Sequence, residues 1–483
     1  MAYQSVIGLE IHVELKTKSK MFCSCLNEPN ERHPNVNICP ICMGHPGVLP
    51  VINKEAVRKV IKTGLSLNCQ IQEFSKFDRK NYFYPDLPKG YQISQYDKPF
   101  CKNGFLKIGK EKIKIRRVHL EEDTGRLLHP EGTDYSLVDF NRAGIPLMEL
   151  VTEPDISLAK EARKFAQELQ LILKYIEVSD ANMEKGQLRV EVNVSLKKPK
   201  SKLLGTKVEI KNLNSFKSVE RAIDYEIERQ SELLNEGKEV IQETRGWHEA
   251  KGKTVSQRKK EEAHDYRYFP EPDLPPLIFS KEEINEIKLE IPELPQDKRK
   301  RLSSEYKLNE GSLEFFVQNR ELGDYFERVV SELGSRLPEN KLNTLIKLAT
   351  NYLITDLQGL LKGGKVSNEG FLITPENFAE FINLIDRGEI SSKIAKIVLN
   401  LMFEKGSDPS QIIEEKGLSQ ITDDEEVLIV VRKVISNNQK AVSDFKKGKK
   451  NAFQFLVGQV MAQAKGRVKP EVAHKILEKE LGV

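Results

Sequence analysis

The 483-residue chain lacks an apolar run long enough to span a bilayer, and its densest apolar stretch covers only Val427 to Val431. The segment from Met1 to Leu15 alternates apolar and polar side chains, a pattern that fits neither a signal peptide nor a transit peptide. We therefore expect a soluble protein of the cytoplasm. The net charge is only +4, which excludes a uniformly basic nucleic-acid coat but permits a local basic patch.

Internal repeats are also lacking, and the length exceeds what one hydrophobic core usually covers, so several domains are expected. Up to about residue 290 the sequence favours strands, Gly/Pro turns and a few helices, whereas beyond Pro292 the apolar residues follow helical i, i+3, i+4 spacing. A second change near Gly406 precedes short helices rich in Lys and Glu. We predict an α+β fold with three domains, namely a mixed domain over 1–292, a helical domain over 293–406 and a helical tail over 407–483.

Residues 7–15 predict a strand with one apolar and one polar face. Isoleucine, leucine and valine alternate strictly with Gly8, Glu10, His12 and Glu14. Two carboxylates that flank an imidazole supply hard oxygen ligands and one nitrogen, a set that suits Mg²⁺ or Mn²⁺ beside nucleotide phosphates. A solvated strand face is the alternative, because alternating charge is usual in antiparallel sheets. Both interpretations stay open at this point.

The same alternation recurs in residues 187–196, where the polar side carries Arg189, Glu191, Asn193 and Ser195. Between the two predicted strands lies a group of acids: Glu121, Glu122, Asp123, Asp139, Glu149 and Glu153. Repulsion among these carboxylates would be costly if they converged without a cation. They therefore either spread into solvent or hold a metal ion.

Four of the six cysteines form two short pairs, Cys23-x-Cys25 and Cys39-x-x-Cys42, separated by a loop. This spacing is typical of a four-thiolate zinc site in a reducing compartment. Because four thiolates leave no open coordination position, such a zinc ion would fold the loop and take no part in catalysis. Free thiols are the alternative, as at the isolated Cys69 and Cys101.

A Walker-like segment, Gly359-x-x-x-x-Gly364-Lys365, has Val366 where a phosphate loop requires Ser or Thr, and the residues before it favour a helix instead of a strand. We reject it as a nucleotide site. Any ATP must then be held by the N-terminal region, where cationic side chains surround the aromatic segment 81–86 (NYFYPD). These cations are Arg79, Lys80 and Lys89.

A basic patch lies between Lys433 and Lys469, where nine Lys or Arg oppose the single acid Asp444. It includes Lys446, Lys447, Lys449, Lys450, Lys465 and Arg467. The interleaved apolar residues have the spacing of a helix core, so the basic side chains could reach an RNA backbone. A solvated helical surface explains the charge equally well.

A series of longer motifs runs through the whole chain: residues 6–15 (VIGLEIHVEL), 77–86 (FDRKNYFYPD), 89–95 (KGYQISQ), 119–123 (HLEED), 137–142 (LVDFNR), 211–216 (KNLNSF), 242–245 (QETR), 265–273 (DYRYFPEPD) and 455–461 (FLVGQVM). Together they closely resemble the B subunits of the aspartyl/glutamyl-tRNA amidotransferase family. The resemblance implies a cradle-shaped catalytic domain on a largely antiparallel sheet, an all-helical linker domain and a small helical tail that binds tRNA.

The resemblance also implies an enzyme subunit, a ligase that phosphorylates the side-chain carboxylate of Glu-tRNA(Gln) or Asp-tRNA(Asn) with ATP and amidates it with channelled ammonia. It implies partner A and C subunits, of which A hydrolyses glutamine. In agreement, the chain has no Gly-Ser-Ser-rich amidase segment, so ammonia must be imported. Which mischarged tRNA is the substrate stays open. The competing hypothesis is a non-catalytic, zinc-stabilised RNA-binding scaffold protein.

Site residues follow from the same resemblance. It implies Mg²⁺ ligands at Glu10, His12, Glu122 and Glu149, with the choice among Glu121, Glu122 and Asp123 left open. It places Lys80 and Lys89 near the end of an ammonia channel. Further candidate cofactor-binding residues are Arg79, Glu191 and Asn193. Glu191 stands where the family usually has Asp, which lengthens that ligand by one methylene. Some members keep the four cysteines and bind zinc, so the expected cofactors are ATP, Mg²⁺ and a structural Zn²⁺.

Overall fold

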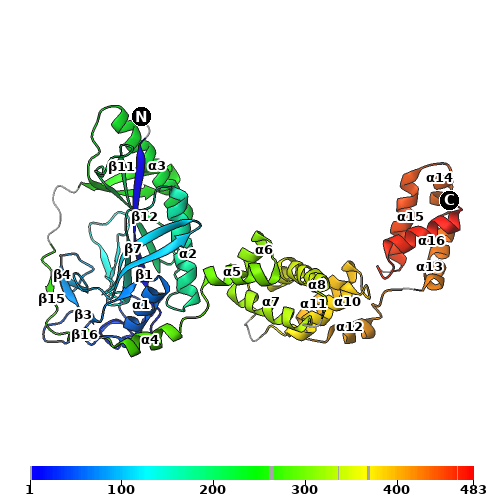
Figure 1. Cartoon of the computed structure of the whole chain (residues 1–483), viewed down its shortest axis with the longest axis horizontal. Coiled ribbons are helices and arrows are strands. Elements are labelled where there is room, and N and C mark those ends of the chain that lie inside the picture. Colours follow the sequence, from blue (N-terminus) through cyan, green and yellow to red (C-terminus); the bar gives the residue numbers. More distant parts are fainter. Residues whose placement is uncertain are drawn as a thin grey trace. The chain divides into compact units, whose positions relative to one another are not determined.

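Figure 1 shows a computed structural model of the chain, and the structure describes residues 3–259, 266–334, 337–366, 370–421, 423–464 and 466–482. Asp265, the first residue of the motif 265–273, and Lys465 of the basic patch lie outside the described residues. The chain divides into two compact units, Met1–Pro295 and Gln296–Val483. Among the described residues, no helix has the length and apolar character needed to cross a membrane.

The first unit is built on a nine-stranded sheet with β1 (Gln4–Glu14) as its middle strand. On one side of β1 follow, in order, β10 (Pro146–Thr152), β7 (Glu111–Glu122), β6 (Cys101–Ile108) and β2 (Gln70–Ile71). On the other side follow β11 (Leu188–Lys197), β12 (Val208–Leu213), β13 (Glu243–His248) and β14 (Lys253–Lys259). Neighbouring strands are antiparallel except for the parallel pair β12–β13. The predicted α+β fold on a largely antiparallel sheet is confirmed.

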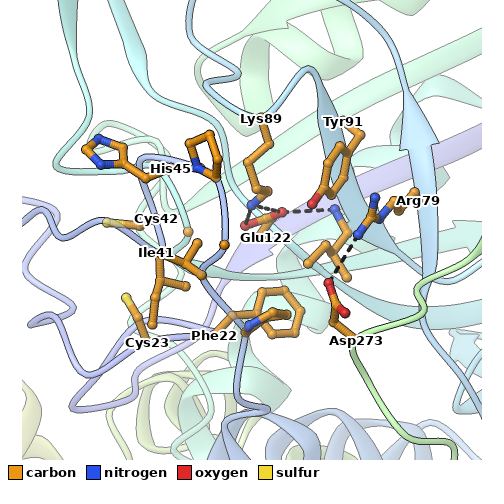
Figure 2. A pocket seen from close by; sticks show the side chains of 17 residues that line it. Phe22, Cys23, Ile41, Cys42, His45, Arg79, Lys89, Tyr91, Glu122 and Asp273 are labelled. Carbon is orange, nitrogen blue, oxygen red and sulfur yellow. Dashed lines mark hydrogen bonds and ion pairs between the residues drawn. The ribbon is translucent and has the colours of Figure 1, made fainter.

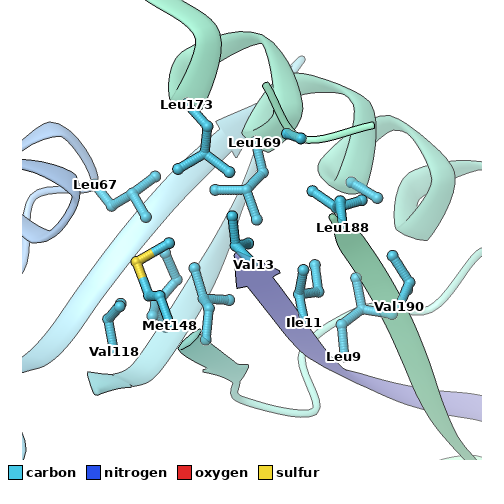
Figure 3. Close-up of a cluster of buried hydrophobic side chains, with 14 of the residues drawn as sticks. Leu9, Ile11, Val13, Leu67, Val118, Met148, Leu169, Leu173, Leu188 and Val190 are labelled. Atoms are coloured by element: carbon cyan, nitrogen blue, oxygen red, sulfur yellow. The ribbon is translucent and has the colours of Figure 1, made fainter. Parts of the chain in front are cut away.

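The apolar face of β1 forms the middle of the hydrophobic core. Its four buried residues are Ile7, Leu9, Ile11 and Val13. Helix α2 (Ala159–Tyr175) covers this face, and Figure 3 shows its Leu169 and Leu173 beside Val13. Each such side chain contributes roughly 1.5–3 kcal/mol when it is fully buried. Because side chains alternate along a strand, burial of this face leaves Glu10 and His12 on the opposite face of the sheet.

Shorter elements flank the main sheet. Helix α1 (Lys54–Ser66) begins after Asn53, whose side chain accepts hydrogen bonds from two backbone N–H groups of the first turn. Helix α3 (Phe216–Asn235) packs against α2 and β11, and α4 (Lys281–Leu289) packs against α1. Small sheets are formed by β15 (Phe269–Pro270) with β4 (Asp78–Asn81) and β5 (Tyr91–Ser94), by β16 (Leu277–Ile278) with β3 (Phe74–Ser75), and by β8 (Arg126–Leu128) with β9 (Leu137–Asp139).

The second unit consists of helices and contains no strand in the part of the chain that the structure describes. The helices are α5 (Pro295–Tyr306), α6 (Glu310–Gln318), α7 (Arg320–Glu332), α8 (Glu339–Asn351), a π-helix (Tyr352–Leu357), α9 (Gln358–Leu361), α10 (Pro375–Asp386), α11 (Ser392–Lys405), α12 (Pro409–Lys416), α13 (Asp424–Asn437), α14 (Gln439–Lys446), α15 (Lys450–Gln463) and α16 (Pro470–Leu481). Gly359 lies within α9, so the rejected Walker-like segment has no strand before it.

The predicted boundary after residue 292 falls close to the division after Pro295. At the second predicted boundary, Gly406 follows the last residue of α11 with a φ of 66°, in the left-handed region that glycine adopts readily. Helices α13 to α16 share a hydrophobic cluster that includes Val431, Leu456 and Leu477. The structure nevertheless keeps helices α6 to α16 in one compact unit. The division into three domains therefore stays a prediction.

Candidate functional site

The strand register gathers polar side chains on one face of the sheet. His12 of β1 lies opposite Glu149 of β10 and Arg189 of β11, and Glu149 lies opposite His119 of β7. Glu10 likewise lies opposite Glu191. Directly opposed residues of antiparallel strands project to the same face, with side chains close enough to interact. The apolar core on the other face therefore forces these imidazoles and carboxylates together.

The distances show two overlapping groups that could hold a metal ion. Glu10, His12 and Glu149 form one, and the other consists of His119, Glu121 and Glu149. His12 Nε2 lies 3.5 Å from Glu149 Oε2 and 3.8 Å from Glu121 Oε1. His119 Nε2 lies 3.5 Å from the same Glu149 oxygen. Glu149 thus joins both groups, and we call the five residues the acid–imidazole cluster.

Electrostatics in the acid–imidazole cluster are strongly perturbed. Burial alone would raise the pKa of Glu149, but the charges of His119 and His12 and a hydrogen bond from His12 hold it well below its usual range. Burial and the charge of Glu149 raise the pKa of Glu10. Burial alone would lower the pKa of His12, but the hydrogen bond and the charge of Glu149 raise it to about 9. The positive charge of protonated His12 compensates the carboxylate of Glu149. A metal cation bound among these groups would supply the same compensation.

The three consecutive acids at the end of β7 point to three different environments. Glu121 accepts a hydrogen bond of 3.0 Å from Ser94 Oγ and belongs to the acid–imidazole cluster. Glu122 projects to the other side, where its oxygens lie 2.5 and 2.6 Å from Lys89 Nζ. Asp123 pairs with Arg189 at 2.5 Å. The alternation of the strand therefore separates Glu122 from Glu10, His12 and Glu149.

Glu122 and Lys89 line a pocket of about 230 Å³. Figure 2 shows their ion pair at one side of it, with Arg79 and Tyr91 nearby and Cys23 and Cys42 on the opposite wall. Arg79 binds Glu271 through two hydrogen bonds of 2.7 and 2.8 Å, and also reaches Asp273 at 3.4 Å. The pocket is therefore lined by paired charges on one side and by the cysteine loop on the other.

Lys80 lies apart from this pocket and beside the acid–imidazole cluster. Its Nζ is 5.1 Å from the ring centre of Tyr266 and 5.8 Å from that of Tyr82, both favourable cation–π distances. Burial alone would lower the pKa of Lys80, but the charges of Glu121 and Glu149 raise it. The ammonium group therefore stays charged inside the protein.

The four predicted thiolate ligands come together in the structure. The Sγ atoms of Cys23, Cys25, Cys39 and Cys42 all lie within 4.8 Å of one another, so the group could hold a metal ion. The Nζ atom of the fully buried Lys20 lies 3.7 Å from Cys42 Sγ. A hydrogen bond from Cys23 and the charge of Lys20 lower the pKa of the Cys42 thiol to about 4. Cys69 and Cys101 are buried in the core, away from this group.

Comparison with known proteins assigns the chain to a family. The family model described as "GatB/GatE catalytic domain" matches residues 5–285, and the one described as "GatB domain" matches residues 324–481. The chain belongs to the GatB family. Similar proteins, named as B subunits of an aspartyl/glutamyl-tRNA(Asn/Gln) amidotransferase, are found in Caldanaerobacter subterraneus subsp. tengcongensis (49% identity over 485 residues, 100% of both chains), Caldicellulosiruptor saccharolyticus (51% over 488 residues, 100% of this chain and 99% of the relative) and Thermotoga maritima (48% over 490 residues, again 100% and 99%).

Membership of the GatB family confirms the resemblance seen in the motifs, and with it the assignment as a B subunit of a tRNA-dependent amidotransferase. The scaffold hypothesis is not favoured. Of the candidate Mg²⁺ ligands, this GatB chain brings together Glu10, His12 and Glu149. Among the described residues Glu122 belongs to neither group, so its role as a ligand stays a prediction. Glu122 extends from the opposite side of β7 and is neutralised by Lys89.

The remaining candidate residues lie either beside the acid–imidazole cluster or along the pocket of Figure 2. Glu191 lies beside Glu10 but is paired with Lys211 Nζ at 2.9 Å. The Oδ1 atom of Asn193 on the same face is buried and makes no hydrogen bond among the described residues. Arg79 and Lys89 line the pocket of Figure 2, and Lys80 faces the acid–imidazole cluster.

Two residues of this GatB site were missed by sequence reasoning as possible ligands or partners, namely His119 and Lys211. His119 could have been found, because it alternates with apolar Val118 and Leu120 and shares the spacing of Glu121. Lys211 could not, since its proximity to Glu191 depends on the pairing of β11 with β12, which no local pattern reveals.

We predict that His12 titrates at a pKa of about 9 in the metal-free protein, and that Glu149→Gln lowers this value. The pKa is above the ordinary 6.5, so the protonated imidazole stabilises the fold at pH below about 6.5, and this contribution is lost as the pH rises through about 9. The measurement is an NMR titration of the His12 ring in the presence of a chelator. Glu153→Gln, which removes a half-buried acid that pairs with Arg116 just after β10, is the control and should leave the titration unchanged. A wild-type pKa near 6.5 would contradict the predicted effect of Glu149 on His12.

Proposed function

We propose that this protein uses ATP to phosphorylate the side-chain carboxylate of glutamate or aspartate esterified to tRNA, and then replaces the phosphate by ammonia. The observation that carries the proposal is the convergence of the acid–imidazole cluster beside the half-buried ammonium group of Lys80, in a chain of the GatB family. The relatives are named for tRNA(Asn/Gln), so both mischarged tRNAs are candidate substrates.

The donor set fits a hard divalent cation. Glu10, His12 and Glu149 offer two carboxylates and one imidazole within 4.8 Å of one another, and burial together with the charge of Glu149 raises the pKa of Glu10, which a bound cation would lower. We propose that Glu10, His12 and Glu149 hold Mg²⁺, with Glu121 and His119 as adjacent partners. When bound, Mg²⁺ neutralises negative charge on the phosphates of ATP during transfer.

The side chains of the protein have distinct tasks in this proposal. A carboxylate does not react with ammonia at useful rates because its leaving group would be oxide, so it needs activation as an acyl phosphate. Lys80 places a fixed positive charge beside the cluster, where the carboxylate and phosphate oxygens carry negative charge. Glu191 and Asn193 extend the polar surface along β11, and in this proposal they help to bind ATP. Lys89 and Arg79 line the pocket of Figure 2, and in this proposal the route for ammonia ends near Lys80 and Lys89.

Ammonia must come from another protein in this proposal. The six thiols are either gathered in the cysteine cluster or buried in the core, so none is placed as an exposed nucleophile for glutamine hydrolysis. We propose as partners the A and C subunits of the amidotransferase, of which A hydrolyses glutamine. An enclosed path between the subunits would keep ammonia unprotonated and away from water. The proposed location of the complex is the cytoplasm.

The decisive experiment is an amidation assay with the purified A, B and C subunits. Glu-tRNA(Gln) and Asp-tRNA(Asn) are supplied separately, each with and without ATP. Amide formation that requires ATP supports the proposal and identifies the substrate. Binding of tRNA without any nucleotide hydrolysis would instead support a scaffold function.

We predict that His12→Ala lowers ATP-dependent amide formation by at least about 100-fold, because it removes one proposed ligand of a charge-stabilising cation. Affinity for tRNA should stay close to that of the wild type, since His12 is half-buried within the sheet face. His129→Ala, which removes an exposed histidine outside the site, is the matched control. Full activity of the His12 variant would rule out this metal site.

We propose that the cysteine cluster binds a structural zinc ion. The wild-type protein should then contain zinc in equal amount to the chain by elemental analysis, and Cys42→Ser should lose it together with thermal stability. Cys69→Ala, which alters a buried thiol outside the cluster, should retain the metal. Zinc that persists at the wild-type level in the Cys42 variant would contradict the assignment.

We propose that the tail over 407–483 binds tRNA through its basic side chains. Four lysines surround the turn between α14 and α15: Lys446, Lys447, Lys449 and Lys450. Deletion of the tail, or alanine at these four positions, should weaken tRNA binding and flatten its salt dependence, because fewer counterions are released. Binding is measured at several salt concentrations. Alanine at Lys198, Lys200, Lys202 and Lys207 removes the same charge between β11 and β12 and is the control. Unchanged affinity after deletion would exclude an RNA-binding tail.

A further inference from the structure

Four tyrosines form a continuous series of ring contacts, which we call the tyrosine row: Tyr82, Tyr266, Tyr268 and Tyr96. The ring centres of Tyr82 and Tyr266 are 6.0 Å apart, as are those of Tyr266 and Tyr268, in both cases edge to face. Tyr268 and Tyr96 are stacked almost parallel, with centres 4.3 Å apart and an angle of 12°. The row thus joins residues that are far apart in the sequence into one aromatic surface.

The inner end of the tyrosine row adjoins the acid–imidazole cluster. Lys80 Nζ lies over the rings of both Tyr82 and Tyr266, and the same ammonium group faces Glu121 and Glu149. The hydroxyl of Tyr82 lies 3.3 Å from Gln92 Oε1. Gln92 lies in β5, and Ser94 of the same strand donates a hydrogen bond to Glu121. The row therefore begins where the proposed chemistry takes place.

The outer end of the row is exposed. Tyr96 has 59% of its surface accessible although one face of its ring is covered by Tyr268. Its backbone N–H donates a hydrogen bond of 3.0 Å to the buried Asp78, so the main chain is fixed while the ring stays outside the core. Hydrophobic packing does not require an aromatic side chain at such a position. A flat aromatic pair at the surface is instead the form that a stacking partner needs.

We propose that the tyrosine row stacks the unpaired nucleotides at the 3′ end of the tRNA and so guides the esterified amino acid to the acid–imidazole cluster. This inference rests on the proposed function. The amino acid is attached to the last nucleotide of a single strand, so the preceding bases must lie along a path that ends at the cluster. Proteins bind single-stranded RNA by stacking its bases on aromatic side chains beside cationic groups. A single adenine of ATP would need one ring, whereas this row extends over four.

The test measures amidation kinetics of the complete complex with Tyr96→Ala and Tyr96→Phe. Loss of one base stack should raise KM for the mischarged tRNA by about 5- to 150-fold, with little change in kcat or in KM for ATP. Tyr96→Phe keeps the ring and should behave as the wild type. Tyr135→Ala, which removes an equally exposed tyrosine outside the row, is the matched control and should also behave as the wild type.

Two kinetic results would overturn the inference. One is a KM for tRNA in Tyr96→Ala that equals that of Tyr135→Ala. The other is an effect confined to KM for ATP, which would assign the row to adenine. If the wild-type complex forms no amide at all, the proposed function fails and the kinetic test is replaced by binding alone.

The binding test uses an RNA hairpin whose unpaired 3′ end carries the fluorescent base 2-aminopurine, which is quenched by stacking. Quenching should occur with the wild-type protein and with Tyr96→Phe, and should be at least halved at saturation with Tyr96→Ala. Equal quenching by Tyr96→Ala and Tyr96→Phe would overturn the inference whether or not the protein catalyses amidation. The fluorescence result thus separates failure of the tyrosine row from failure of the proposed chemistry.

Discussion

The site depends on the antiparallel register of β11, β1, β10 and β7. A shift of one residue in β1 would turn Glu10 and His12 into the core and bring Ile11 to the polar face. The packing of α2 on the apolar face of β1 opposes such a shift, because several fully buried side chains would be lost from the core. Hydrophobic burial on one face thus holds like charges together on the other. Burial first, and the charge of Glu149 second, raise the pKa of Glu10 on this face.

The protein neutralises its consecutive acids one by one. Glu121 faces two imidazoles, Glu122 meets Lys89, and Asp123 meets Arg189. A buried carboxylate without a partner is costly, so each of these acids needs its own cation. Strand alternation sends the first two acids to opposite sides of the sheet. The third follows the end of β7. One short segment of sequence therefore supplies carboxylates to three separate environments.

Local patterns predicted what depends on local geometry. The two faces of residues 7–15 follow from alternation alone, and the thiol cluster follows from the spacing of two cysteine pairs. The place of Glu122 was taken from family resemblance, although the alternation of Val118, His119, Leu120 and Glu121 already indicates that Glu121 shares the polar face. The opposition of His12 and Glu149 was beyond reach, because it is fixed by pairing between strands more than a hundred residues apart in sequence.

The loop that carries the four cysteines packs directly against Lys89, the partner of Glu122. Gly44, two residues after Cys42, has a φ of 68°, and a Cβ there would collide with the side chain of Lys89. The loop can therefore lie directly against the lysine only because this position has no side chain. Cys23 and Cys42 form the opposite wall of the same pocket. A metal ion that fixes the four thiolates would fix that wall as well, and with it the space in which Lys89 and Glu122 can move. The cysteine cluster therefore affects this pocket through packing alone, because four thiolates leave no coordination position for substrate.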